Sequence, residues 1–156
     1  MSDKEILRYK RQLNDLFDKV STLESDLEMQ SHWARYLCIR VSGFLEVAVS
    51  TIYKNYAKDK AAPFVFNYID KQLSGFQNPN MEKILNITRA FSADWAKEIE
   101  LELSKNSEIK DSIDSIVKNR NKIAHGENVG ITYSRMKVYY ENALKLVKLL
   151  EEQCDR

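Results

Sequence analysis

Apolar residues recur at helical spacing along almost the whole chain. Residues 4–29 carry them on a seven-residue repeat, which predicts one long helix with an apolar seam. The seam consists of Ile6, Tyr9, Leu13, Leu16, Val20, Leu23 and Leu27. Such a seam packs inside a bundle or against a second copy of the chain. We favour the bundle, which is the commoner arrangement.

The next elements follow from apolar pattern and capping residues. Residues 31–58 are apolar nearly all round, which predicts a central helix. Pro63 and Gly75 bound a short helix, since proline suits a first helical position and glycine a stop. Further helices are expected after the capping residues Asn80, Ser92 and Ser107, and a last one over 134–153.

These elements predict an all-α fold. The chain contains only 4 Gly and 2 Pro, too few for the turns of an all-β protein. Its 156 residues fit a single domain, which we place at 1–156. We therefore expect a compact bundle of five to seven helices, with the last two forming an antiparallel hairpin.

Cysteine usage and the N-terminus bear on where the protein works. Cys38 and Cys154 show no spacing typical of a disulfide framework or a zinc site, and we expect no metal and no cofactor. The charged N-terminus lacks the apolar core of a signal peptide. Arg40 and Glu46 interrupt the most apolar stretch and argue against a membrane span. We expect a cytoplasmic protein.

The most informative segment lies at the end of the helix expected within residues 107–126. Its apolar stripe is formed by Ile109, Ile113, Ile116 and Ile123. Arg120 falls on this stripe, where an unpaired guanidinium is costly, so it needs a partner or a groove. Glu46 is the obvious carboxylate partner, either as a plain core ion pair or as support for a site. His125 follows Arg120 by five residues, just before Gly126.

Charge concentrates around this segment. The chain has a net charge of +1, yet residues 115–140 hold five Lys and Arg residues against a single Glu. A local positive field favours an anionic ligand such as a phosphate backbone. An ordinary solvated helix face explains the lysines about equally well.

The string Arg120-Asn121-Lys122-Ile123-Ala124-His125-Gly126, near the end of a small helical domain, resembles the motif of the HEPN superfamily, and its RiboL-PSP branch most closely. The family motif is an arginine followed after a short spacer by a histidine, often with Asn directly after the arginine. Asn121 fills that place. A tyrosine two residues after the histidine marks a neighbouring, nucleotidyltransferase-paired branch, but Glu127 stands there.

The resemblance implies a metal-independent endoribonuclease that acts as a two-fold dimer, with the motifs of two protomers in one cleft. Its catalytic residues would be Arg120 and His125, supported by Asn121, Lys122 and Glu46. Cleavage would yield 2′,3′-cyclic phosphate and 5′-hydroxyl ends. Family members commonly act as toxins or phage-defence effectors, so an antitoxin or sensor partner is compatible with the resemblance.

The chemistry and helix geometry agree with a composite site. Metal-free cleavage needs a base, an acid and positive charge on the phosphate, and histidine titrates near neutrality without help. At about 100° per residue, Asn121 and His125 share a face while Arg120 lies about 140° from His125. A groove between two copies can collect all three. The second histidine, His32, fits a structural role better than catalysis.

Two other functions compete with this hypothesis. One is a non-catalytic dimeric interaction or adaptor module of the same superfamily, against which the intact Arg120, Asn121 and His125 count. The other is a coiled-coil scaffold built on the first helix, which leaves Arg120 unexplained. For His125 alone, interaction with the negative end of the helix dipole would be an ordinary structural role.

Overall fold

The computed structural model describes residues 3–23 and 25–156, and every regular element in this part of the chain is a helix. The seven helices are α1 (Lys4–Ser21), α2 (Leu27–Lys60), α3 (Pro63–Ser74), α4 (Met81–Phe91), α5 (Ala93–Lys105), α6 (Ser107–Ala124) and α7 (Tyr133–Cys154). The predicted all-α bundle is therefore confirmed.

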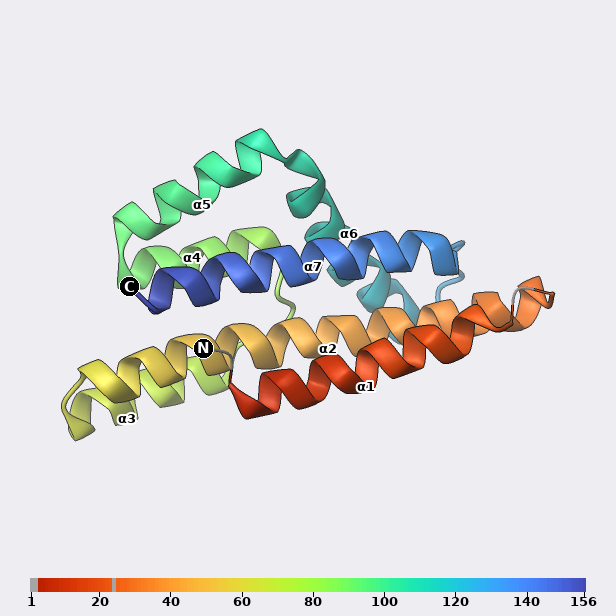
Figure 1. The fold of residues 1–156 in the computed structure, drawn as a ribbon. Coiled ribbons are helices and arrows are strands. Elements are labelled where there is room, and N and C mark those ends of the chain that lie inside the picture. Colours follow the sequence, from red (N-terminus) through yellow and green to blue (C-terminus); the bar gives the residue numbers. More distant parts are fainter. Residues whose placement is uncertain (1–2, 24) are drawn as a thin grey trace.

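Helix α2 is the centre of the bundle. It packs against α1, α3, α6 and α7, and Figure 1 shows α1 and α7 running along its length while α4 and α5 lie beyond α7. By length and composition alone α2 could cross a membrane, but 56% of its most apolar window is buried, as in the core helix of a bundle. The central position predicted for residues 31–58 is confirmed.

The first predicted helix, 4–29, is wrong at its C-terminal end. Helix α1 stops at Ser21 and α2 begins at Leu27. The Asp26 side chain caps α2 by accepting a hydrogen bond from the backbone N–H of Met29 at 3.0 Å. A capping carboxylate therefore starts a new helix where the apolar repeat runs on without interruption.

The end of the predicted seam confirms this boundary. Val20 is buried, whereas Leu23 lies half-buried in the turn and Leu27 is 76% exposed. Glu24, which the predicted helix included, lies outside the described residues. The seam is thus an internal one between α1 and the bundle, and it ends with α1.

Close approach of α1 to α2 depends on Gly43. A Cβ at this position would lie 2.9 Å from the Tyr9 hydroxyl, closer than packed atoms tolerate. The same hydroxyl donates to the carbonyl of Arg40 at 3.4 Å, and the Tyr9 ring packs against Phe44. Glycine therefore lets a tyrosine of α1 reach the backbone of α2.

The link between α3 and α4 ties α2 to α6. The Glu46 carboxylate on α2 accepts a hydrogen bond from the Asn78 N–H at 3.2 Å. The Asp114 carboxylate on α6 accepts one from the Met81 N–H at 2.9 Å. Residues 78–81 thus bind both helices, so they mark one side of the α2–α6 pair.

The link from α6 to α7 is anchored at the opposite end of the molecule from α3. Val129 and Ile131 of this link are buried, and the Tyr133 hydroxyl donates to the carbonyl of Phe17 near the end of α1 at 3.1 Å. Figure 1 shows this link at the same end as the α1–α2 turn. Helix α6 therefore runs towards the end of the bundle where α2 begins, and Figure 1 shows it crossing α2 obliquely.

Candidate functional site

The C-terminal end of α6 places His125 in a defined backbone geometry. His125 is the C-cap residue, with φ −91° and ψ 10°, and Gly126 follows with φ +74°. The Gly126 N–H donates to the carbonyl of Ile123 at 3.0 Å, and the Glu127 N–H to that of Lys122 at 2.9 Å. This pair of bonds is a Schellman motif, which satisfies the last carbonyls of the helix and fixes the peptide on either side of His125.

The His125 side chain is exposed. Its backbone N–H donates to the carbonyl of Asn121 at 3.1 Å, which continues the helical pattern by one residue. Its imidazole makes no hydrogen bond or ion pair within the described chain. Both ring nitrogens are therefore open to water or to a ligand.

Arg120 bends towards the neighbouring Asn121. The Arg120 Nη1 donates to Asn121 Oδ1 at 3.3 Å, and both side chains are half-buried. Since the two residues lie about 100° apart around the helix, this bond turns the guanidinium from the stripe facing α2 towards the face that holds His125. The structure thus brings Arg120 and Asn121 together directly.

The charge of Arg120 lies close enough to Cys38 of α2 to act on its thiol. The Cys38 thiol donates to the carbonyl of Ile116 on α6 at 3.4 Å. Burial raises the pKa of the Cys38 thiol to about 12, and the positive charge of Arg120 acts in the opposite direction. Arg120 therefore lies where α2 and α6 meet, one turn beyond Ile116.

Glu46 and Arg120 do not form the ion pair that the sequence suggested. Glu46 is half-buried and binds the Asn78 N–H instead, and no carboxylate forms an ion pair with Arg120 among residues 3–23 and 25–156. The backbone N–H of Asn78 in the α3–α4 link donates a hydrogen bond to the Glu46 carboxylate. Glu46 thus anchors that link, and Arg120 keeps an uncompensated charge.

Lys122 lies beside His125 rather than beside Arg120. Three residues separate Lys122 from His125, so they stand about 60° apart, one turn apart along α6. The Lys122 side chain is half-buried. It can place a positive charge near the histidine.

An open hollow of about 720 Å³ adjoins Asn121 between α4 and α6. Its cationic lining residues are Arg89, Lys110 and Lys118. Arg89 is held by Glu100 at 2.9 Å and Lys110 by Asp114 at 3.4 Å. Lys118 has no such partner in the described chain, and it lies one turn before Asn121 on the same face.

The sequence analysis does not predict this hollow. The three-residue spacing of Lys118 and Asn121 indicates that both lie on one face of α6, and this face forms one wall of the hollow. No local signal exists for Arg89, because it comes from a separate helix that only the fold brings close.

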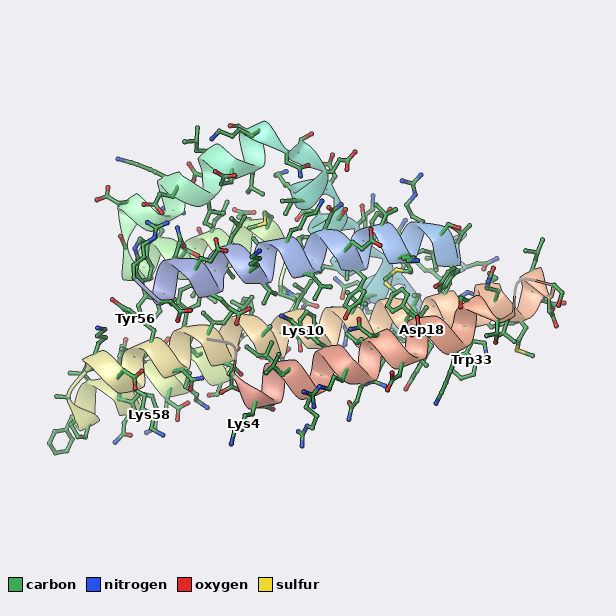
Figure 2. All side chains as sticks on the ribbon, in the orientation of Figure 1. Lys4, Lys10, Asp18, Trp33, Tyr56 and Lys58 are labelled. Atoms are coloured by element: carbon green, nitrogen blue, oxygen red, sulfur yellow. The ribbon has the colours of Figure 1, made fainter. Side chains whose placement is uncertain are left out.

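His32 is exposed and stands apart from this arrangement. It lines a shallow hollow with Leu16, Trp33 and Tyr36, where the two aromatic rings pack edge to face at 5.6 Å. Figure 2 shows Trp33 near the end of the bundle where α1 and α2 meet. Within the described chain, no hydrogen bond, ion pair or shared pocket joins His32 to Arg120 or His125.

No group of three or more His, Cys, Asp or Glu side chains is arranged to hold a metal ion within the described parts of the chain. The arrangement at the end of α6 instead offers an open imidazole, an arginine without a carboxylate partner and an amide that orients it. These groups can bind a phosphate and transfer protons.

The chain is similar to a known protein family. The family model described as RiboL-PSP-HEPN matches residues 4–156. HEPN domains are often ribonucleases, and they commonly bind RNA and dimerise. Neither the curated proteins nor the solved structures contain a match to the chain.

Proposed function

We propose that this chain, which belongs to the RiboL-PSP branch of the HEPN superfamily, is a metal-independent endoribonuclease. The proposal is supported by the end of α6, where Arg120 bonds to Asn121 and His125 is exposed with no hydrogen bond or ion pair from its imidazole in the described chain. In the reaction the 2′-oxygen attacks the adjacent phosphorus and the bond from phosphorus to the 5′-oxygen breaks. The products carry 2′,3′-cyclic phosphate and 5′-hydroxyl ends.

His125 is the proton-transfer group. One imidazole accepts the proton of the 2′-hydroxyl, and a protonated one gives a proton to the departing 5′-oxygen. Open ring nitrogens support this role, because a histidine already bound to a carbonyl or carboxylate would have to break that bond first. The Schellman turn supports it too, since it fixes the backbone that carries the ring.

Arg120 stabilises the charge that builds on the phosphate. Its planar fork can bind two non-bridging oxygens at once, which a lysine cannot reproduce. Its lack of a carboxylate partner among the described residues leaves the charge available. Asn121 holds the guanidinium on the His125 side of the helix and so acts as its positioning residue. Lys122 adds positive charge beside the histidine.

The two acid/base groups come from two copies of the chain. A single protomer offers one exposed histidine at the motif, since His32 lies in a different hollow. A two-fold axis beside α6 brings a second His125 to the same phosphate. The RNA therefore binds across a homodimer with one composite cleft.

The cellular role follows from the family by analogy. We place the protein in the cytoplasm, as a toxin or phage-defence effector whose activity is restrained by an antitoxin or sensor. The two free cysteines, Cys38 and Cys154, suit a reducing compartment.

A non-catalytic interaction module is the second candidate, and an exposed apolar surface favours it. On α3, Phe64 is 89% exposed, Tyr68 66% and Val65 52%. Exposed apolar groups on one short helix are typical of a protein-binding surface. This surface is also compatible with a nuclease that binds a regulator.

Product analysis distinguishes the two functions. Purified protein is incubated with labelled RNA in excess EDTA, beside the same RNA carrying 2′-O-methyl groups. We expect cleavage of the unmodified RNA alone, leaving cyclic phosphate and 5′-hydroxyl ends. Intact RNA in every sample, or cleavage that also occurs in the 2′-O-methyl RNA, would favour the interaction module or a different chemistry.

A further inference from the structure

Arg35 on α2 is an arginine that has no partner in the described part of the chain. Its side chain is half-buried, and its Nε is enclosed with no hydrogen-bond partner in the described chain. No ion pair within residues 3–23 and 25–156 involves it. A buried guanidinium N–H in a folded protein is normally bonded, so the fold leaves Arg35 with hydrogen-bonding capacity that the described chain does not use.

Arg40, on the same helix, shows the contrast. Its Nη1 donates to the Tyr36 hydroxyl at 3.2 Å, and its guanidinium lies over the rings of Tyr9 and Tyr36 at 5.5 and 5.8 Å. The fold thus supplies partners for one half-buried arginine of α2 and none for the other. Arg35 and Arg40 are five residues apart, which places them about 140° apart around the helix axis. Their side chains therefore leave α2 on different sides.

Helix geometry places Arg35 level with the motif. Cys38 contacts Ile116 where α2 and α6 cross, and the two helices run in opposite senses along the bundle. Arg35 precedes Cys38 by three residues, and Arg120 follows Ile116 by four, so each lies one turn further towards the same end of the pair.

The side of the pair is fixed by residues 78–81. They bind Glu46 on α2 and Asp114 on α6, so both carboxylates face one side. Arg35 precedes Glu46 by eleven residues and His125 follows Asp114 by eleven, and eleven residues return to nearly the same face of a helix. Arg35 and His125 therefore face the same side of the helix pair.

We infer that Arg35 is a second phosphate-binding residue of this site, which contacts the RNA phosphate next to the one bound by Arg120. The inference rests on the proposed function. Two guanidinium groups without carboxylate partners in the described chain, at one level of the same helix pair, form a site for two negative charges. Consecutive phosphates of a single RNA strand supply such charges.

Binding of a 2′-O-methyl oligoribonucleotide tests the inference without cleavage. Its affinity for the full chain is measured at several salt concentrations, for the wild type, Arg35→Met and Arg8→Met. Methionine keeps an unbranched apolar stem, so packing around position 35 is preserved. Arg8 is an exposed arginine of α1 and is the matched control. Loss of one phosphate contact is expected to reduce the slope of log affinity against log salt by about 0.7 in Arg35→Met only.

Cleavage of unmodified RNA provides the second measurement. We expect Arg35→Met to lower kcat/KM about tenfold or more, and Arg35→Lys to recover part of the loss through its charge. An Arg35→Met variant with the wild-type salt slope would overturn the inference, even if its cleavage fell together with its unfolding midpoint. A selective loss of dimerisation with an unchanged slope would overturn it too, because Arg35 would then pair with the second copy. A wild type that neither binds nor cleaves RNA would overturn the proposed function itself.

Discussion

Arg120 and His125 are held by the fold to very different degrees. Arg120 is half-buried between α2 and α6 and is turned by Asn121, whereas only the backbone of His125 is fixed. A phosphate-binding group gains from such preorganisation, because the charge is in place before the substrate arrives. A proton-transfer group needs open nitrogens instead. The two residues thus show the burial that suits their proposed roles.

Cys38 makes the contact between α2 and α6 sensitive to alkaline pH. Burial raises its pKa from the ordinary value of 9.0 to about 12, so the unfolded chain loses this proton first as pH rises. The stabilisation is complete below pH 9 and is lost between pH 9 and about 12. We expect the wild type to lose up to about 1.4 kcal/mol more unfolding free energy per pH unit in this range than Cys38→Ala.

Urea unfolding at intervals from pH 8 upward measures this difference. Burial also raises the pKa values of Tyr53 and Cys154, but both variants share these groups, so the comparison isolates Cys38. If the unfolding free energies of wild type and Cys38→Ala changed equally with pH, the thiol would not contribute to the pH dependence of stability.

At the scale of helices, the sequence predicted which segments are helical, but it did not predict the boundary between α1 and α2. The capping residues Asn80 and Ser92 do cap α4 and α5, because short polar side chains at an extended residue satisfy local N–H groups. The prediction that Ser107 caps the next helix is wrong, because Ser107 is the first residue of α6 and the N-cap residue is Asn106. The apolar repeat does not predict the break between α1 and α2, because the repeat continues through the residues at which the chain turns. Asp26 was the signal that could have located it.

The end of α6 is the element on which the site depends most. Gly126 has φ +74°, a conformation that costs an L side chain about 1–2 kcal/mol. We expect Gly126→Ala to lower the unfolding free energy by about 1–2 kcal/mol for this reason, and to reduce cleavage by displacing His125. Thermal unfolding and RNA cleavage are measured together.

Gly130→Ala is the matched control in the same link. A Cβ at Gly130 meets nothing within 4 Å, as at Gly126, but its backbone lacks a positive φ. Its unfolding free energy should stay within about 0.5 kcal/mol of the wild type. Equal effects of the two substitutions would show that the left-handed turn is not what holds the histidine.

At the scale of the whole molecule, sequence and fold contribute different parts of the site. The string from Arg120 to His125 is contiguous, so the motif could be read directly. Arg89 reaches the hollow beside Asn121 from another helix, and only the packing of α4 against α6 brings it near. The predicted Glu46 partnership failed for the same reason, because the α3–α4 link that binds Glu46 cannot be placed from spacing.

The composite site predicts that activity depends on protein concentration. If two copies of His125 share one cleft, specific activity should fall when the protein is diluted below the dissociation constant of the dimer. Cleavage rates and sedimentation velocity are measured over the same dilution series. A monomer with undiminished specific activity would contradict a composite cleft while leaving the chemistry at His125 open.

The most direct test of the central claim compares His125→Ala with His32→Ala under single-turnover conditions in EDTA. Both substitutions remove an exposed imidazole, so neither should shift the unfolding midpoint appreciably. We predict that His125→Ala slows RNA cleavage at least about 100-fold, the effect of losing general acid–base catalysis, while His32→Ala cleaves at the wild-type rate. Equal rates for the two variants would contradict the account.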